Sequence, residues 1–91
     1  MLFLVHMVVN IPHDLPKEQA QEIIATEKAY SQDLQRAGKW VNLWRVVGEY
    51  ANYSVFEAES NDDLHDMLSK LPLFPYMDIT VTPLAKHPSA I

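Results

Sequence analysis

The spacing of apolar and polar residues predicts where the chain forms strands and helices. Residues 1–10 are rich in β-forming side chains and largely apolar on both alternating faces, which predicts a strand covered on both sides. A loop with two prolines follows at residues 11–16. Apolar residues then recur at three- and four-residue spacing over residues 17–37, which predicts an amphipathic helix with Gly38 as its C-terminal cap.

The next part of the chain predicts a hairpin and a second helix. Residues 39–50, with Gly48 near a turn, and residues 51–59 both have the composition of strands, and they follow one another closely enough to pair. Ser60 and Asp63 have the spacing of a capping box, in which each residue satisfies a free backbone N–H at the start of a helix. This pair predicts a helix over residues 61–70.

The last part of the chain adds one strand and completes a recognisable order of elements. Residues 71–76, "LPLFPY", predict no regular structure because two prolines interrupt them, whereas residues 77–84 predict a strand and residues 85–91 a tail. The order strand, helix, strand, strand, helix, strand is that of the ferredoxin-like βαββαβ fold. We therefore expect one α+β domain over residues 1–91, with a four-stranded antiparallel sheet and two helices on one face.

Helices on one face leave the other face of such a sheet open. That second face is still apolar here, with Leu2, Leu4 and Val8 on the first strand and tryptophan and tyrosine positions on the hairpin. A large exposed apolar patch is typical of an interface. We expect copies of the chain to pair sheet to sheet, as in dimeric α+β barrel assemblies, or to build a larger ring.

Composition narrows the choice of partners and compartment. The formal net charge is −5 and the lysines and arginines are scattered, which argues against nucleic acid and anionic membranes as partners. The apolar N-terminal run is shorter than the ~20 residues that span a bilayer, and it lacks the basic start of a signal peptide. The chain has no cysteine, which excludes disulfides and thiolate metal sites and favours a reducing cytoplasm.

One carboxylate stands on the side of the first helix that should face the protein interior. On a helical wheel, Glu27 falls within the arc of the apolar residues and Lys28 lies at the edge of that arc. In one interpretation Glu27 tilts to the rim or pairs with a cation. In the other it faces a cavity between helix and sheet, where partial desolvation makes it a usable general base near neutral pH.

Other polar residues are candidates for binding a small molecule. Asn52 and Ser54 share one face of their strand; they belong either to an exposed edge or to a pocket that offers hydrogen bonds. Arg45 is either a surface charge or the fork that binds a carboxylate. His65, at the flank of the second helix, is either a boundary residue or a catalytic group.

The sequence lacks the common motifs of metal and cofactor sites. None of the four histidines has the spacing of a metal site, and no nucleophile elbow, phosphate-binding loop or dinucleotide fingerprint is present. If the chain is an enzyme, it is expected to move a proton with side chains alone. A non-catalytic ligand-binding barrel protein is the alternative.

Three stretches of the chain carry a resemblance to a known family. The string "LWRVVGEYANYSVFEAES" at residues 43–60, "LPLFPYMDITVTPL" at residues 71–84 and the opening "MLFLVHMVVNIP" resemble the muconolactone isomerase family. The resemblance extends over nearly the whole chain. Chloromuconolactone dehalogenases and methylmuconolactone isomerases share this plan and are the alternatives.

The resemblance implies a fold, an assembly and a reaction. It implies a ferredoxin-like subunit that forms sheet-packed dimers and a decameric ring. It also implies conversion of (+)-muconolactone to 3-oxoadipate enol-lactone, in the catechol branch of the β-ketoadipate pathway, with no metal or cofactor. Glu27 matches the family's helix glutamate and is implied as the base.

The same resemblance suggests roles for the remaining candidates. His65, Asn52 and Ser54 are candidates to hydrogen-bond the lactone oxygen as negative charge develops on it. Arg45 and Lys28 compete for the acetate arm of the substrate.

Overall fold

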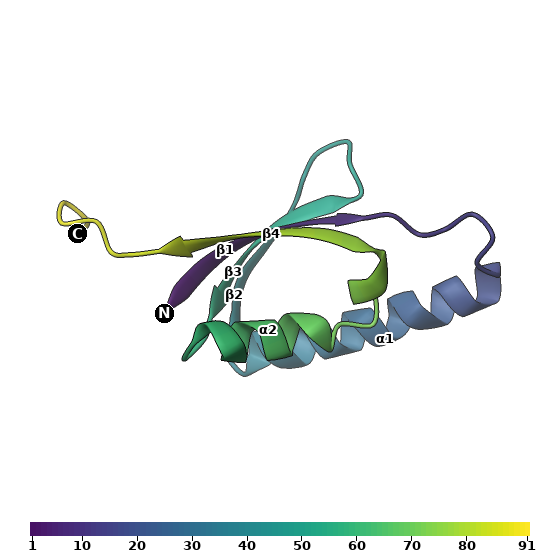
Figure 1. Cartoon of the computed structure of the whole chain (residues 1–91), viewed down its shortest axis with the longest axis horizontal. Helices are drawn as coiled ribbons and strands as arrows, with labels where there is room; N and C mark the ends of the chain where they lie inside the picture. Colours follow the sequence, from purple (N-terminus) through teal and green to yellow (C-terminus); the bar gives the residue numbers. More distant parts are fainter.

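The computed structural model describes residues 1–91 and contains four strands and two α-helices in the predicted order. The elements are β1 (Leu2–Val9), α1 (Lys17–Arg36), β2 (Trp40–Arg45), β3 (Ala51–Glu57), α2 (Asn61–Ser69) and β4 (Met77–Leu84). The strands form one antiparallel sheet in the spatial order β2-β3-β1-β4, and both helices lie on the same side of it (Figure 1). The prediction of a ferredoxin-like α+β fold is therefore confirmed. No helix is both long enough and apolar enough to cross a membrane.

The two faces of β1 have different surroundings, as expected for a sheet with both helices on one side. Phe3, Val5 and Met7 are almost completely buried beneath the helices. They join one apolar cluster with residues of α2, among them Leu64 and Leu68. The burial of this face fixes the register of the sheet, because a shift by one residue would turn Phe3, Val5 and Met7 outward.

The opposite face of the sheet is open, and it remains apolar. Leu2 on β1, Trp44 on β2 and Tyr53 on β3 keep 43%, 54% and 43% of their surface exposed. His6 lies among them and stacks on the ring of Tyr53, with the ring centroids 4.4 Å apart. This open face is the surface that the sequence predicts for pairing between copies.

Two predictions about local structure were wrong, the end of the second strand and the absence of regular structure at residues 71–76. Strand β2 ends at Arg45 and not at residue 50, because the chain turns at residues 46–50 with Gly48 at φ 83°, a conformation that favours glycine. Residues 71–76 do contain regular structure, a short 3₁₀ helix at Phe74–Tyr76. Pro75 fits its first turn, where the N–H that proline lacks needs no partner.

The predicted capping box at the start of α2 is confirmed with one variation. The backbone N–H of Asp63 donates to Ser60 Oγ over 3.0 Å. The carboxylate of Asp63 in turn accepts from the backbone N–H of Glu59 over 2.9 Å, one residue before the position expected for this pair. Together these bonds set where α2 begins.

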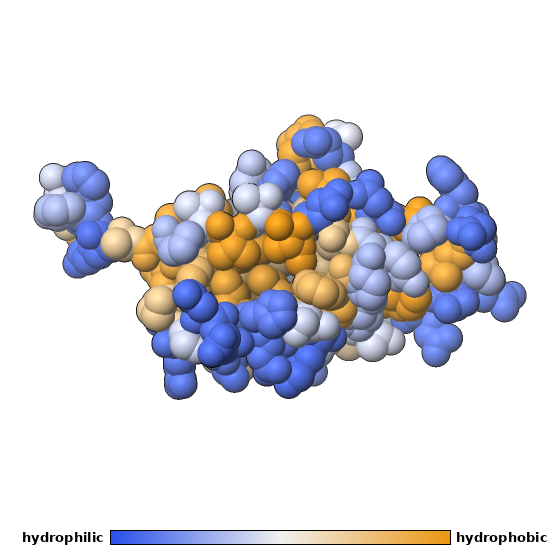
Figure 2. Space-filling model, viewed as in Figure 1, coloured by the Kyte–Doolittle hydropathy of each residue, from blue (hydrophilic) through white to orange (hydrophobic).

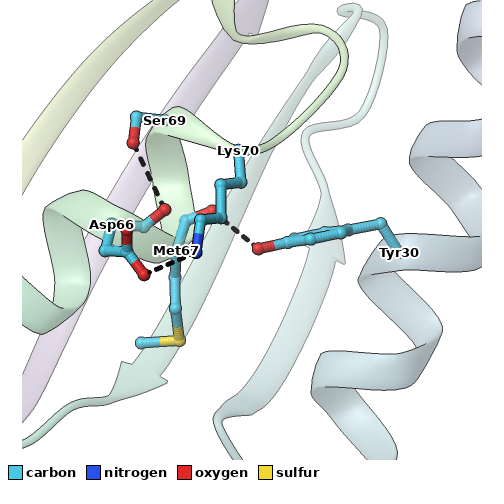
Figure 3. Close-up of polar contacts among 5 residues, drawn as sticks. All are labelled: Tyr30, Asp66, Met67, Ser69 and Lys70. Atoms are coloured by element: carbon cyan, nitrogen blue, oxygen red, sulfur yellow. Dashed lines mark hydrogen bonds and ion pairs between the residues drawn. The ribbon is translucent and has the colours of Figure 1, made fainter.

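A single hydrogen bond ties the two helices together. Tyr30 Oη on α1 donates to the backbone carbonyl oxygen of Met67 on α2 over 3.3 Å, beside the ion pair between Lys70 and Asp66 (Figure 3). Burial raises the pKa of the Tyr30 phenol, which therefore stays neutral and able to donate. Tyr30 is three residues after Glu27 and lies on the same side of α1, so this tie also holds the carboxylate over the sheet.

Candidate active site

A cavity of about 340 Å³ opens between α1 and one end of the sheet, where the lining also includes Val9 of β1 and Met77 of β4. Glu27 and Lys28 reach it from α1, Arg45 from the end of β2, and Asn52 from β3. Most of the other lining residues are apolar. A concave apolar site with a few convergent polar groups is the usual form of a small-molecule site, and this volume lies at the small end of the usual range.

Glu27 lies where the helical wheel predicts, half-buried in the wall of this cavity. Its Oε1 accepts a hydrogen bond of 2.9 Å from the backbone N–H of Leu73. Burial raises the pKa of Glu27 above its ordinary value of 4.5, and the bond from Leu73 opposes that rise in part. The carboxylate is thus held in place, partly removed from water, and a stronger proton acceptor than an exposed glutamate.

The interpretation that Glu27 pairs with a cation is excluded by the ion pairs of the structure. The structure contains three ion pairs, which join the Met1 amino group with Glu57, Arg36 with Asp33, and Lys70 with Asp66. None of them includes a residue of the cavity. Glu27 therefore carries its charge in the cavity without a cationic partner.

The two cations of the cavity, Lys28 and Arg45, also have no carboxylate partner. The Arg45 guanidinium lies 5.8 Å from the centre of the Tyr50 ring, which is within the range of a cation–π contact. With Glu27 ionised, these three residues leave the cavity with one net positive charge. The site is suited to a small anion, and a guanidinium pairs with a carboxylate in particular.

Asn52 and Ser54 lie on the helix-facing side of β3, where they oppose Met7 and Val5 of β1. Asn52 lines the cavity, whereas Ser54 is completely buried and does not line it. Ser54 Oγ donates to Asn52 Oδ1 over 2.7 Å. Of the two predicted hydrogen-bonding residues, only Asn52 is therefore placed to contact a ligand.

His65 is not brought to this cavity. It lies on α2 at a separate groove beside β4, where its neighbours include Phe3 and Val81. Figure 2 shows apolar surface along this side of the molecule, between β4 and the helices. The cavity of Glu27 lies at the end of the sheet that holds Val9 and Met77, whereas the groove of His65 lies toward the other end of β1 and β4. The single chain therefore does not bring His65 and Glu27 together, and a catalytic role of His65 stays a prediction.

Three further residues of the cavity were missed by the sequence reasoning. Leu73 contributes a backbone N–H, which leaves no mark in the sequence. The Tyr50 ring contacts the Arg45 guanidinium from the turn at residues 46–50, which the predicted strand over residues 39–50 had included. Trp40 lines the cavity, and its indole N–H is buried without a hydrogen-bond partner.

Known proteins with the same fold and similar sequences identify the family. Residues 1–90 match the family described as muconolactone delta-isomerase. Over 91 residues the chain is 67% identical to the muconolactone Delta-isomerase of Cupriavidus pinatubonensis, a match covering 100% of this chain and 99% of that protein. It is 65% identical to muconolactone Delta-isomerase 1 of Acinetobacter lwoffii, covering 100% and 95%.

Solved structures agree with this match. The crystal structure of a muconolactone isomerase aligns with a TM-score of 0.95 at 54% identity, covering 100% of this chain and 95% of that one. A 5-chloro-2-hydroxyhydroquinone dehydrochlorinase from Burkholderia phenoliruptrix aligns with a TM-score of 0.66 at 21% identity over 96% of both chains, a likeness of fold alone. The chain belongs to the muconolactone Δ-isomerase family.

Proposed function

We propose that the protein is a muconolactone Δ-isomerase that converts (+)-muconolactone to 3-oxoadipate enol-lactone, with Glu27 as the group that carries the proton. The observation that supports this most is the state of Glu27: it is partly desolvated, held by the N–H of Leu73, and free of any cation. The names of the full-length relatives supply the substrate.

The reaction requires one proton to move between two carbons of the lactone ring. The ring carbon next to the ring oxygen carries an acidic proton, because its removal gives a dienolate whose charge reaches the lactone carbonyl. Glu27 breaks this C–H bond and takes the proton. It then returns the proton to the carbon α to the carbonyl, which moves the double bond and restores the carboxylate. No proton or electron is gained or lost overall.

The remaining polar groups of the cavity fit the two polar parts of this substrate, its lactone carbonyl and its charged acetate arm. Asn52 provides an amide that can donate to the carbonyl oxygen as negative charge develops there. Arg45 and Lys28 provide unpaired cations for the acetate arm. The apolar lining excludes water from the ring and so protects the dienolate from stray protonation.

The proposal is tested by mixing the purified protein with (+)-muconolactone and following the formation of enol-lactone. Absence of turnover would contradict it and would favour a non-catalytic ligand-binding role. A competition assay addresses the alternative within the family: a chloromuconolactone dehalogenase would release chloride from 5-chloromuconolactone faster than it isomerises the parent lactone. We expect the parent lactone to react faster.

The pH dependence of the reaction should report the environment of Glu27. The base acts only when ionised, and burial raises its pKa above 4.5. We therefore expect kcat/KM to fall tenfold per pH unit as the pH decreases below an apparent pKa that lies above 4.5. The measurement is kcat/KM for muconolactone across the acid range, since this quantity reports the pKa of the free enzyme.

A matched control is available on the same helix. Glu22 is exposed and lies outside the cavity, so Glu22→Gln removes an equal charge without touching the base. The acid limb should keep its position in this variant. An apparent pKa at or below 4.5 in the wild-type protein would contradict the role of burial.

We also propose that two copies pair through the open face of the sheet, and that such dimers build the decameric ring expected from the resemblance. The exposed side chains of Leu2, Trp44 and Tyr53 support this, because a monomer would leave them in water. Leu4→Lys places a charge among them and is expected to reduce the assembly to monomers. Light scattering coupled to size-exclusion chromatography measures the change.

The control places the same charge on the other side of the molecule. Ala25 is exposed on α1, and Ala25→Lys should keep the wild-type mass. A monomeric wild-type protein, or an unchanged oligomer in Leu4→Lys, would contradict pairing through this face.

A further inference from the structure

The strand β3 carries two polar side chains in succession on the face that looks toward α1. Asn52 lies at the cavity, opposite Arg45 of β2, and is partly exposed. Ser54 is the next residue on the same face and has no exposed surface. A completely buried hydroxyl behind a cavity residue cannot contact a ligand, so any effect of Ser54 on the reaction has to pass through a neighbour.

That neighbour is the side-chain amide of Asn52. Ser54 Oγ donates to Asn52 Oδ1, and the distance of 2.7 Å is typical of a well-formed hydroxyl-to-oxygen hydrogen bond. An asparagine amide has an acceptor end and a donor end. With Oδ1 turned toward Ser54, the opposite end, Nδ2, is the one left for the cavity. Asn52 Nδ2 itself makes no hydrogen bond within the chain.

The direction of the amide matters because of where Asn52 lies. It forms the sheet side of the cavity, and Glu27 forms the helix side. A ligand ring between them has the base on one side and the amide on the other. A donor there stabilises a carbonyl oxygen that gains negative charge, whereas the acceptor end would repel it.

We propose that Ser54 is a positioning residue that holds the Asn52 amide with Nδ2 facing the cavity, so that Asn52 donates to the lactone carbonyl oxygen as the dienolate forms. This inference rests on the proposed isomerase function and assigns two roles within the same site. Asn52 contacts the substrate, and Ser54 acts only through Asn52. Because the amide is neutral, it stabilises the dienolate without adding a cation that would lower the pKa of Glu27.

A double-mutant cycle tests the coupling between the two residues. Asn52→Leu removes the donor and should lower kcat about 30-fold, with a smaller change in KM. Ser54→Ala frees the amide to rotate and should lower kcat about fivefold. In the Asn52→Leu background, Ser54→Ala should change kcat by less than twofold, because the amide through which Ser54 acts is gone.

Two further variants separate this role from a purely structural one. Asn52→Asp keeps the acceptor for Ser54 but presents a carboxylate oxygen in place of the donor, so its kcat should fall below that of Asn52→Leu. Ser69→Ala removes a hydroxyl hydrogen bond on α2, far along the chain from β3, and should leave kcat unchanged. The melting temperature of each variant shows whether a loss of kcat is accompanied by a loss of protein stability.

Three results would overturn the inference while leaving the isomerase function in place. They are full activity of Ser54→Ala, the same fold-loss from Ser54→Ala in both backgrounds, and a kcat for Asn52→Asp above that of Asn52→Leu. A wild-type protein that fails to convert muconolactone would overturn both proposals together. The wild-type assay therefore distinguishes the two kinds of failure.

Discussion

Replacing Glu27 with glutamine is expected to lower kcat for muconolactone about 10³-fold while the fold stays intact. The amide has nearly the same shape as the carboxylate, and its oxygen can still accept the hydrogen bond from the backbone N–H of Leu73. It cannot take a proton from the ring carbon. The loss should appear in kcat and kcat/KM together, because the substrate still fits the cavity while the base is absent.

The same variant should be more stable than the wild-type protein at neutral pH. Burial raises the pKa of Glu27 in the folded state, so the stability that its neutral form contributes is complete below pH 4.5 and is lost as the pH rises through the raised pKa. Glutamine never ionises and keeps that contribution. The melting temperature of Glu27→Gln should therefore be higher than that of the wild type at pH 7, and this difference should become small at acidic pH.

These two measurements together separate a catalytic carboxylate from a structural one. If the carboxylate were structural, its substitution would lower the stability of the protein and would affect activity only through unfolding. Glu22→Gln, on the exposed side of α1, should change neither kcat nor the pH dependence of stability. Wild-type activity in Glu27→Gln would keep the family assignment and remove Glu27 as the base.

The fold could be predicted from periodicity where one face of an element is buried and the other is not. The assignment of Leu2, Leu4 and Val8 to the open face leaves Phe3, Val5 and Met7 for the helix-covered face, because burial in a strand follows every second residue. Periodicity did not locate the end of β2 at Arg45, because the residues after it also have β-forming side chains. The turn there depends on the backbone conformation of Gly48.

The site could be predicted only as far as one element determines it. The helical wheel placed Glu27 toward the interior, since that depends on α1 alone. The alternation along β3 could not distinguish Asn52 from Ser54, because the two residues share a face of the strand. They differ in how deeply they lie beneath the neighbouring strands and helices. The sequence pattern also could not show that His65 lies beside β4, because the position of α2 over the sheet is set by packing between distant segments.

Arg45→Met is expected to lower kcat/KM for muconolactone about 10²-fold, mainly through KM, because hydrogen bonds to a charged group are worth ~1.5–3 kcal/mol. The same change at Lys28 should cost less than tenfold. A guanidinium offers two parallel N–H groups that match the carboxylate of the acetate arm, whereas an ammonium is a mobile point charge. Arg36→Met removes a guanidinium from a surface ion pair with Asp33 and is the matched control.

The positions of the two cations relative to Glu27 also favour Arg45. Lys28 and Glu27 both reach the cavity from α1, so an acetate bound by Lys28 would lie on the same side of the cavity as the base. Arg45 approaches from the sheet, where the nearby Tyr50 ring restrains it. An acetate drawn to Arg45 keeps the two negative charges apart while the ring carbon that bears it faces Glu27. A larger loss in Lys28→Met than in Arg45→Met would reverse this assignment and place the acetate arm along the helix.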